Sequence, residues 1–293
     1  MTYAYSTIKK VGRTFLPVRT RARILNAAAA VKEWREEREW ARLGHRMCSA
    51  LRSVPDVEHL PQCVLHFNNG LNAFGQYRLI FRDLIYHFEA ERPNPLILDC
   101  GSNIGVSMLY FKHVYPGARI IGFEPDPAIF PCLQKNVRDN GLADVELIQA
   151  ALTPSPGVLT FYSDGLSGSC LGQNLPKDLP EGWVKYDVPC VRLRDYITEP
   201  VDFLKMNIEG AEWEALADCD ERLEAVRQMV IEYHHWKGLP RTLHQILELL
   251  HRRGFTYSIN HFDYDVNPAL RPPFRLTADT RYYLMIFAKR LEE

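Results

Sequence analysis

The feature that most constrains this chain is an alternation of short apolar runs and helical patterns that begins at Leu96. Apolar runs of strand length occupy residues 96–100, 119–124, 145–150, 202–208, 228–233, 254–259 and 282–288. Apolar residues recur with the spacing of a helix in residues 105–115, 127–140, 210–219 and 240–253. Nearly continuous apolar strands joined by helices predict an α/β fold with a mostly parallel sheet covered on both faces. Three prolines and no clear helix separate the last two runs, so we expect the last strand to be antiparallel.

Two parts of the chain depart from this alternation. Residues 1–60 combine basic side chains with strong helix formers, and no acidic residue precedes Glu33. We therefore predict a basic helical N-terminal extension, followed by a main domain at 61–293. The extension is interpreted as a helical cap, and the alternative is a basic amphipathic helix that contacts an anionic membrane or a partner protein. Residues 151–192 form an insertion, in which strand-like segments flank a Gly- and Ser-rich loop at 163–174. This loop is either an acceptor-binding lid or a disordered surface insertion.

The composition argues against several classes of protein. A net charge of −1 gives no basic field that would make nucleic acid the expected partner. The seven cysteines include no C-x-x-C pair, so neither a disulfide framework nor a zinc ribbon is predicted. No apolar run approaches the length of a membrane span, and no signal peptide is evident. These features predict a cytoplasmic protein, and they do not indicate its oligomeric state.

A tight turn follows the first strand, in the stretch "LILDCGSNIGVSMLYF" that begins at Leu96. Gly101 and Gly105 lack a Cβ, so the backbone can pass close to a ligand. Asn103 lies between them and is one of the few other residue types that tolerate left-handed backbone angles. Because ligands of such sheets bind beyond the carboxyl ends of the strands, the turn is a candidate binding element. A plain connection between strand and helix is the alternative interpretation.

An acid ends the second strand, in "RIIGFEPDP". Glu124 at this point can accept hydrogen bonds from both hydroxyls of a ribose. The alternative role, an acid at a helix N-terminus, is already filled by Asp126. The glycine turn and Glu124 together predict a nucleoside cofactor.

The turn also indicates which nucleoside is bound. A nicotinamide dinucleotide requires G-x-G-x-x-G, whereas this chain reads "GSNIGV" from Gly101, and the P-loop pattern is missing as well. Asp99 precedes the turn, and a carboxylate suits an amino group and a sulfonium better than a pyrophosphate. The sequence therefore favours S-adenosylmethionine as the cofactor.

Five segments resemble the FkbM family of S-adenosylmethionine-dependent methyltransferases. They are "LILDCGSNIGVSMLYF", "IGFEPDPAIFPCLQKNVRDNG", "LIQAAL", "VPCVRLRDYI" and "VDFLKMNIEGAEWEAL", which span residues 95 to 260 approximately. The resemblance implies a Rossmann-like, seven-stranded sheet with an antiparallel last strand. It also implies methylation of a hydroxyl, often on a sugar, so the expected acceptor is a small molecule or a carbohydrate. The cofactor residues that it implies are Asp99, Gly101, Asn103, Gly105 and Glu124, with Gln149, Ala150 and Ala151 against the adenine.

One residue departs from the pattern of that family. Similar members carry aspartate in the D-x-E-G motif where this chain has Asn207. Asparagine cannot act as a carboxylate base, although its carbonyl oxygen still accepts a hydrogen bond. A catalytically degenerate member that binds without turnover is therefore one alternative. A nucleic-acid methyltransferase is another, which the missing N-P-P-Y-like turn and the balanced charge disfavour.

A base must take the proton of a hydroxyl acceptor. Glu209 and Glu212 follow the fourth strand, where they could equally be acids in the first turn of a helix. His234 and His235 follow the fifth strand, and histidine titrates near neutrality. We favour His234 as the base, with Asn207 and Glu209 beside it and Glu232 able to orient a histidine. Asn207, Glu209 and Glu232 leave a metal site open as an alternative, but their spacing is not diagnostic, so no metal site is predicted.

Overall fold

The protein is described here by a computed structural model, which covers residues 18–49, 55–166, 168–171, 182–235, 240–260 and 282–291. The chain divides into two compact units, Met1–Ala50 and Leu51–Glu293. We predicted that the N-terminal extension would continue to residue 60, whereas the first compact unit ends at Ala50. Its contact with a membrane or a partner stays a prediction, because residues 1–17, which carry part of its basic charge, lie outside the described residues.

The first unit contains one long helix, α2 (Val18–Met47). Four consecutive alanines lie within it, and no Gly or Pro interrupts it before Gly44, so its backbone strongly favours the helix. Its described surface carries an ion pair one helical turn apart, between Lys32 and Glu36 at 3.5 Å. Of all the helices within the described ranges, not one combines the length and the apolar character that crossing a membrane requires.

The second unit is built on a seven-stranded sheet with the order β12-β13-β11-β10-β3-β4-β5. Its strands are β3 (Leu96–Cys100), β4 (Arg119–Phe123), β5 (Val145–Ile148), β10 (Val201–Met206), β11 (Val226–His235), β12 (Thr256–Asn260) and β13 (Tyr282–Lys289). Strands β3, β4, β5, β10 and β11 run parallel, while β13 pairs antiparallel with both β11 and β12. The predicted Rossmann-like sheet with its antiparallel last strand is therefore confirmed.

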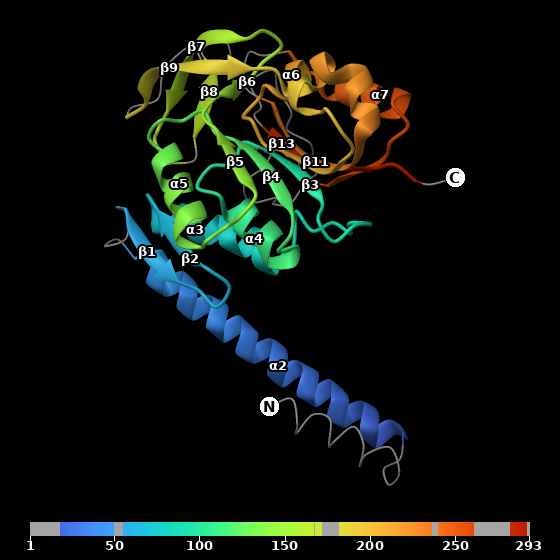
Figure 1. Ribbon diagram of the computed structural model, residues 1–293. Coiled ribbons are helices and arrows are strands. Elements are labelled where there is room, and N and C mark those ends of the chain that lie inside the picture. Colours follow the sequence, from blue (N-terminus) through green and yellow to red (C-terminus); the bar gives the residue numbers. More distant parts are fainter. Residues whose placement is uncertain are drawn as a thin grey trace, which may run out of the picture. The chain divides into compact units, whose positions relative to one another are not determined.

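Helices cover both faces of this sheet (Figure 1). They are α4 (Val106–Val114), α5 (Phe130–Asp139), α6 (Glu212–Cys219) and α7 (Leu243–Arg252). Figure 1 shows α4 and α5 on one face and α6 and α7 on the other. Every residue of the central strands β3 and β10 is buried, which explains why their apolar runs are continuous and do not alternate. The chain leaves β3 through α4 towards β4 and leaves the adjacent β10 through α6 towards β11. These connections run in opposite directions and open a crevice at the carboxyl ends of β3 and β10.

The insertion at 151–192 forms a second sheet of four strands, with the order β6-β9-β7-β8. The strands are β6 (Ala151–Leu152), β7 (Gly157–Ser163), β8 (Ser169–Leu171) and β9 (Val184–Val191). Its apolar face, with Phe161 and Leu171, packs against Ile208 and Ala211 in the turn that follows β10. The insertion therefore supports the ends of the strands where a ligand would bind.

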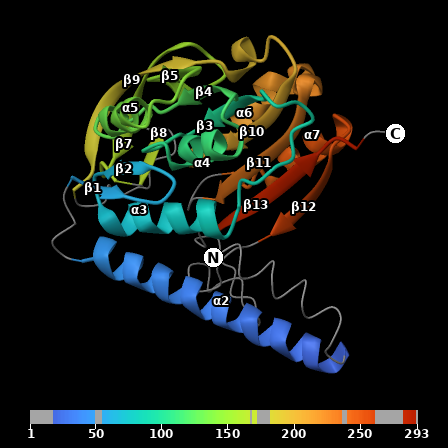
Figure 2. The same ribbon diagram turned by 60° about the horizontal axis from the view of Figure 1, so that its bottom comes forward.

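Residues 55–95 contain elements that the sequence did not reveal. They are the hairpin of β1 (Asp56–His59) and β2 (Val64–Phe67), the helix α3 (Gly70–Tyr77) and a π-helical turn, η2 (Arg78–Arg82). Figure 2 shows the hairpin beside α5. Two asparagines hold it there, Asn136 of α5 and Asn140 directly after that helix. Each accepts a hydrogen bond from a backbone N–H of β2 and donates one to a β2 carbonyl.

Candidate functional site

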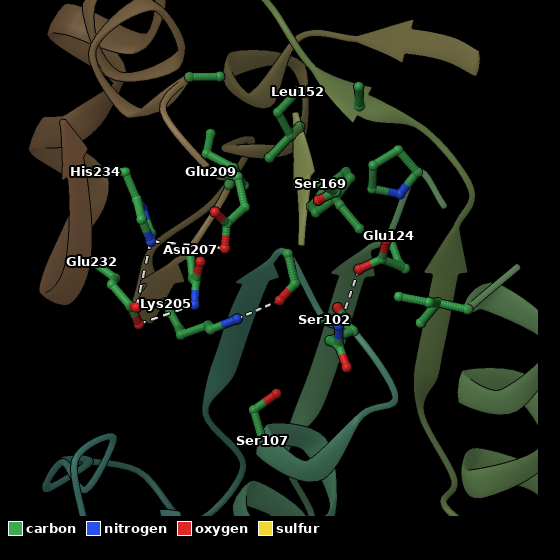
Figure 3. Close-up of a pocket in the computed structure, with 18 of the residues that line it drawn as sticks. Ser102, Ser107, Glu124, Leu152, Ser169, Lys205, Asn207, Glu209, Glu232 and His234 are labelled. Atoms are coloured by element: carbon green, nitrogen blue, oxygen red, sulfur yellow. Dashed lines mark hydrogen bonds and ion pairs between the residues drawn. The ribbon is translucent and has the colours of Figure 1, made fainter. Parts of the chain in front are cut away.

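A cavity of about 530 Å³ opens at the carboxyl ends of the parallel strands. Its wall combines the glycine turn after β3, the end of β4, the turn after β10, the end of β11, the insertion, and residues 76–86. Figure 3 shows Ser102 and Glu124 at one side of this cavity and Asn207, Glu209, Glu232 and His234 at the other. The cavity therefore joins Glu124 and part of the glycine turn to the predicted catalytic residues.

The glycine turn is shaped by the strand beside it. Gly101 has a φ of 82°, and a Cβ at this position would lie 1.7 Å from the backbone oxygen of Asn207. The backbone N–H groups of Gly101 and Ser102 both donate to the carbonyl of Phe123, which closes the turn over β4. Gly105, with a φ of 86°, leaves no room for a Cβ because Leu133 Cδ1 would be 2.6 Å away. Gly101 lines the cavity, whereas Gly105 packs behind it.

Asn103 connects the glycine turn to two other parts of the wall. It adopts a φ of 49°, in the left-handed region that asparagine tolerates. Its side-chain oxygen accepts a hydrogen bond from Gln76 Nε2 at 3.0 Å, and its Nδ2 donates to the carbonyl of Leu166 at 3.3 Å. The turn is thereby tied to α3 and to the insertion.

Glu124 lines the cavity with a carboxylate held by backbone donors. Its Oε2 accepts the N–H of Asn103 at 2.7 Å, and its Oε1 accepts the N–H of Asp126 at 2.9 Å. Burial raises the pKa of Glu124 to about 7, although these two hydrogen bonds oppose the shift. Each oxygen of a carboxylate has a second lone pair, so this one is oriented to accept further donors such as ribose hydroxyls.

Asp99 does not line the cavity, contrary to what direct contact with a cofactor requires. Its register in β3 places it opposite Lys205 of β10, whose Nζ lies 3.2 Å from its Oδ1. Ser107 donates to its other oxygen at 2.5 Å. Lys205 and Ser107 reach the cavity in its place, and Lys205 also donates to the carbonyl of Gly101. A lysine within the apolar stretch "VDFLKM" is the sequence signal that could have revealed this pairing.

Of the three residues expected against the adenine, two are in the wall. Ala150 lines the cavity together with Ala151 and Leu152, and all three are buried. Gln149 follows the end of β5 at Ile148, is exposed and is not part of the lining. The apolar wall that remains suits a flat, uncharged ring.

The opposite side of the cavity holds a cluster of Asn207, Glu209, Glu232 and His234 (Figure 3). Asn207 Nδ2 donates to Glu232 Oε2 at 2.9 Å. His234 Nε2 lies 3.5 Å from Glu232 Oε1 and 3.7 Å from Glu209 Oε1. Glu232 and His234 share one face of β11 because side chains alternate along a strand, and His235 lies buried on the other face.

Glu212 supports this cluster from outside the cavity, and its side chain is not part of the lining. It is the first residue of α6, and its Oε1 accepts the backbone N–H of Gly210 at 3.0 Å. The same oxygen is 3.1 Å from His234 Nδ1. Burial alone would lower the pKa of His234, but Glu209, Glu212 and Glu232 outweigh it and raise this pKa well above the usual value.

Glu209 stands at the tip of the turn that follows β10. It has a φ of 55° and precedes Gly210 with a φ of 97°, so two left-handed residues in succession turn the chain into α6. Burial raises the pKa of Glu209 to about 7, the neighbouring carboxylates add to this shift, and His234 opposes it. In the ranges that the structure describes, no three His, Cys, Asp or Glu side chains are arranged to hold a metal ion.

The pairing of Asn207 with Glu232 leads to a prediction. In Asn207→Asp, a carboxylate would face the Glu232 carboxylate across the present 2.9 Å contact. Like charges this close cannot both stay ionised, so the pKa of the pair rises above its value in the unfolded chain. We therefore expect a loss of about 1–3 kcal/mol in the free energy of unfolding at pH 8 that shrinks as the pH falls and disappears only near pH 4, around the pKa of a carboxyl group in the unfolded chain. Denaturant titrations at both pH values measure this loss.

The double variant Asn207→Asp/Glu232→Gln is the matched control for this prediction. It restores one amide and one carboxylate with the direction of the hydrogen bond reversed, so stability at pH 8 should recover. An equal loss in the single and the double variant would show that the charge at position 207 is not the cause.

Comparison with known proteins finds similarity to methyltransferases. The sequence profile described as the Methyltransferase FkbM domain matches residues 99–257. A methyltransferase of Sordaria araneosa, sdnD, is 32% identical over 238 residues, which cover 70% of this chain and 91% of that protein. The 31-O-demethyl-FK506 methyltransferase FkbM of Streptomyces tacrolimicus is 30% identical, with the same coverage of both chains. The 2-O-methyltransferase NoeI of Sinorhizobium fredii is 28% identical over 49% of this chain and 65% of its own length.

Proposed function

The chain belongs to the FkbM methyltransferase family, and we propose that it transfers a methyl group from S-adenosylmethionine to a hydroxyl oxygen of a small-molecule or carbohydrate acceptor. The observation that carries the proposal is the shared cavity. One end of it offers Glu124 and the glycine turn, and the other offers the polar cluster around His234. A donor and an acceptor bound at the two ends would be held next to each other.

The residues at the first end fit the cofactor. Two backbone N–H groups hold the carboxylate of Glu124 in place. A carboxylate at this position can accept hydrogen bonds from the two hydroxyls of a ribose. Ala150, Ala151 and Leu152 give an apolar wall for the adenine. The bound cofactor supplies an electrophilic methyl group on a sulfonium. The chain itself positions the acceptor and removes the proton of the hydroxyl.

Oxygen is the proposed methyl acceptor for two reasons. The names of two relatives specify methylation at oxygen, the 31-O position of FK506 in one and a 2-O position in the other. The polar cluster also lies at the carboxyl ends of β10 and β11, where a carboxylate can take the proton that a hydroxyl must lose. The turn after β10 reads "MNIEG", which differs from the N-P-P-Y-like turn typical of enzymes that methylate exocyclic amines of nucleic acids.

The test is methyl transfer from a labelled cofactor. We expect the purified chain to move labelled methyl groups from S-adenosylmethionine to neutral alcohols of a screening panel that contains glycosides and O-demethylated macrolides. RNA and DNA are included in parallel and should remain unlabelled. Binding of the cofactor without label in any compound would indicate a non-catalytic binding protein, and label in nucleic acid would replace the proposed acceptor class.

A further inference from the structure

His234 lies at the centre of three carboxylates that come from three elements. Glu232 is on the same strand, Glu209 is in the turn after β10, and Glu212 begins α6. His234 Nδ1 is 3.1 Å from Glu212, and Nε2 is 3.5 Å from Glu232 and 3.7 Å from Glu209. Both ring nitrogens therefore face carboxylate oxygens.

This geometry determines the protonation of the ring. An ionised carboxylate only accepts hydrogen bonds, so each ring nitrogen that faces one must carry a hydrogen. A histidine with a hydrogen on both nitrogens is a cation with no lone pair left in the ring. Such a ring cannot accept a proton from an acceptor hydroxyl, although the sequence alone made His234 the favoured base.

We propose that Glu209 takes the proton of the acceptor hydroxyl and that His234 is a positioning residue that keeps its own proton; the inference rests on the proposed function. In the step, the hydroxyl O–H bond breaks and its proton passes to a Glu209 carboxylate oxygen. The electron pair released on the acceptor oxygen forms the bond to the methyl carbon, and the pair of the breaking carbon–sulfur bond stays on sulfur. Glu209 then returns the proton to solvent.

Glu209 is singled out by its place in the cavity wall and by its exposure. Glu212 is 1% exposed, does not line the cavity, and accepts the N–H of Gly210 as well as contacting His234. Glu232 accepts a hydrogen bond from the side-chain amide of Asn207, and its side chain is 13% exposed. Glu209 lines the cavity and has the most exposed side chain of the three, at 22%. It is therefore the carboxylate that an acceptor can reach.

The charges that face Glu209 match this role. They come from His234 and Glu232 on β11, from Glu212 on α6 and from Asp164 in the insertion, while the ring of Tyr283 on β13 lies against His234. The carboxylates and burial raise the pKa of Glu209 to about 7, and His234 limits the rise. A carboxylate with this pKa is partly ionised at neutral pH and is more basic than an ordinary glutamate.

The first experiment compares kcat against pH for variants, with an acceptor identified in the methyl-transfer screen. Glu209→Gln should lower kcat about 100-fold or more at pH 8 and remove the rise of kcat around pH 7, while calorimetric affinity for S-adenosylhomocysteine is unchanged. His234→Gln should keep that rise but move it to higher pH, because the cation that lowers the pKa of Glu209 is gone. Its kcat should approach the wild-type value at high pH.

Glu214→Gln is the matched control, since Glu214 follows Glu209 closely in the sequence, lies in α6 and is not part of the cavity wall. It should leave the whole profile unchanged. The inference is overturned if His234→Gln loses about 100-fold at every pH while Glu209→Gln keeps its rise near pH 7.

A second measurement uses the unmodified protein and needs no acceptor. Nitrogen-15 NMR of histidine-labelled protein, with His234 assigned from the spectrum of His234→Gln, reports the hydrogen on each ring nitrogen. We expect both nitrogens of His234 to be protonated at pH 7.5 and to show no titration near pH 6.5. A neutral His234 at pH 7.5 contradicts the inference even if methyl transfer is demonstrated, and absence of methyl transfer leaves this result interpretable by itself.

Discussion

Replacing Gly101 with alanine is expected to destabilise the unit Leu51–Glu293 by roughly 4–5 kcal/mol, at the upper end of single substitutions. The added Cβ would lie 1.7 Å from the backbone oxygen of Asn207 and 2.8 Å from its carbonyl carbon. Neither atom can move like the end of a flexible side chain, because Asn207 N–H donates to the carbonyl of Cys100 and fixes β10 beside β3. Either these central strands separate or the glycine turn opens, and both outcomes remove the cofactor end of the cavity.

Gly141→Ala is the control for Gly101→Ala. Gly141 also has a positive φ, 60°, but an added Cβ meets nothing within 4 Å. Its cost should be only the left-handed backbone of alanine, roughly 1–2 kcal/mol. Urea titrations followed by circular dichroism give both free energies of unfolding. Similar losses in the two variants would mean that backbone strain, and not the contact with Asn207, makes glycine necessary at position 101.

The main sheet could be predicted from the sequence because its signals are local. Central strands buried on both faces give continuous apolar runs, and each predicted run of the sheet corresponds to an observed strand, from β3 at Leu96 to β13 at Tyr282. The antiparallel direction of β13 could be inferred because a parallel strand requires a crossover connection, usually a helix. The sequence between the last two apolar runs shows no clear helix. Residues 55–95 gave no such local signal, since β1 and β2 are short strands and β2 is held by asparagine side chains in α5 and at its C-terminal end.

The site could be predicted only where the role of a residue follows from its own position. Gly101, Asn103 and Glu124 lie at strand ends, and the topology brings strand ends together. The relation of Asp99 to the cavity depends instead on the register between β3 and β10, which places Lys205 opposite it. The protonation of His234 depends on Glu212, which comes from another element. Charges from distant segments determine these properties, so single motifs could not reveal them.

Replacing Glu124 with alanine is expected to weaken the binding of S-adenosylhomocysteine by roughly 2–4 kcal/mol, because two hydrogen bonds to a charged acceptor are lost. Calorimetry measures the change, and Glu146→Ala, an exposed glutamate on the neighbouring strand β5, should leave affinity unchanged. Hydroxyl donors bind the ionised carboxylate, and the pKa of Glu124 is about 7. Affinity of the wild type should therefore rise as the pH increases through 7 and level off above it.

A ribose analogue separates the two ways in which Glu124 can act. Besides facing the cavity, its carboxylate accepts the N–H groups of Asn103 and Asp126, so its loss could also loosen the glycine turn. The wild type should bind adenosine more tightly than 2′,3′-dideoxyadenosine, and Glu124→Ala should bind the two alike. If the variant weakened both ligands equally and kept their difference, Glu124 would act through the turn and not through the ribose, and the ribose hydroxyls would have another partner in the cavity.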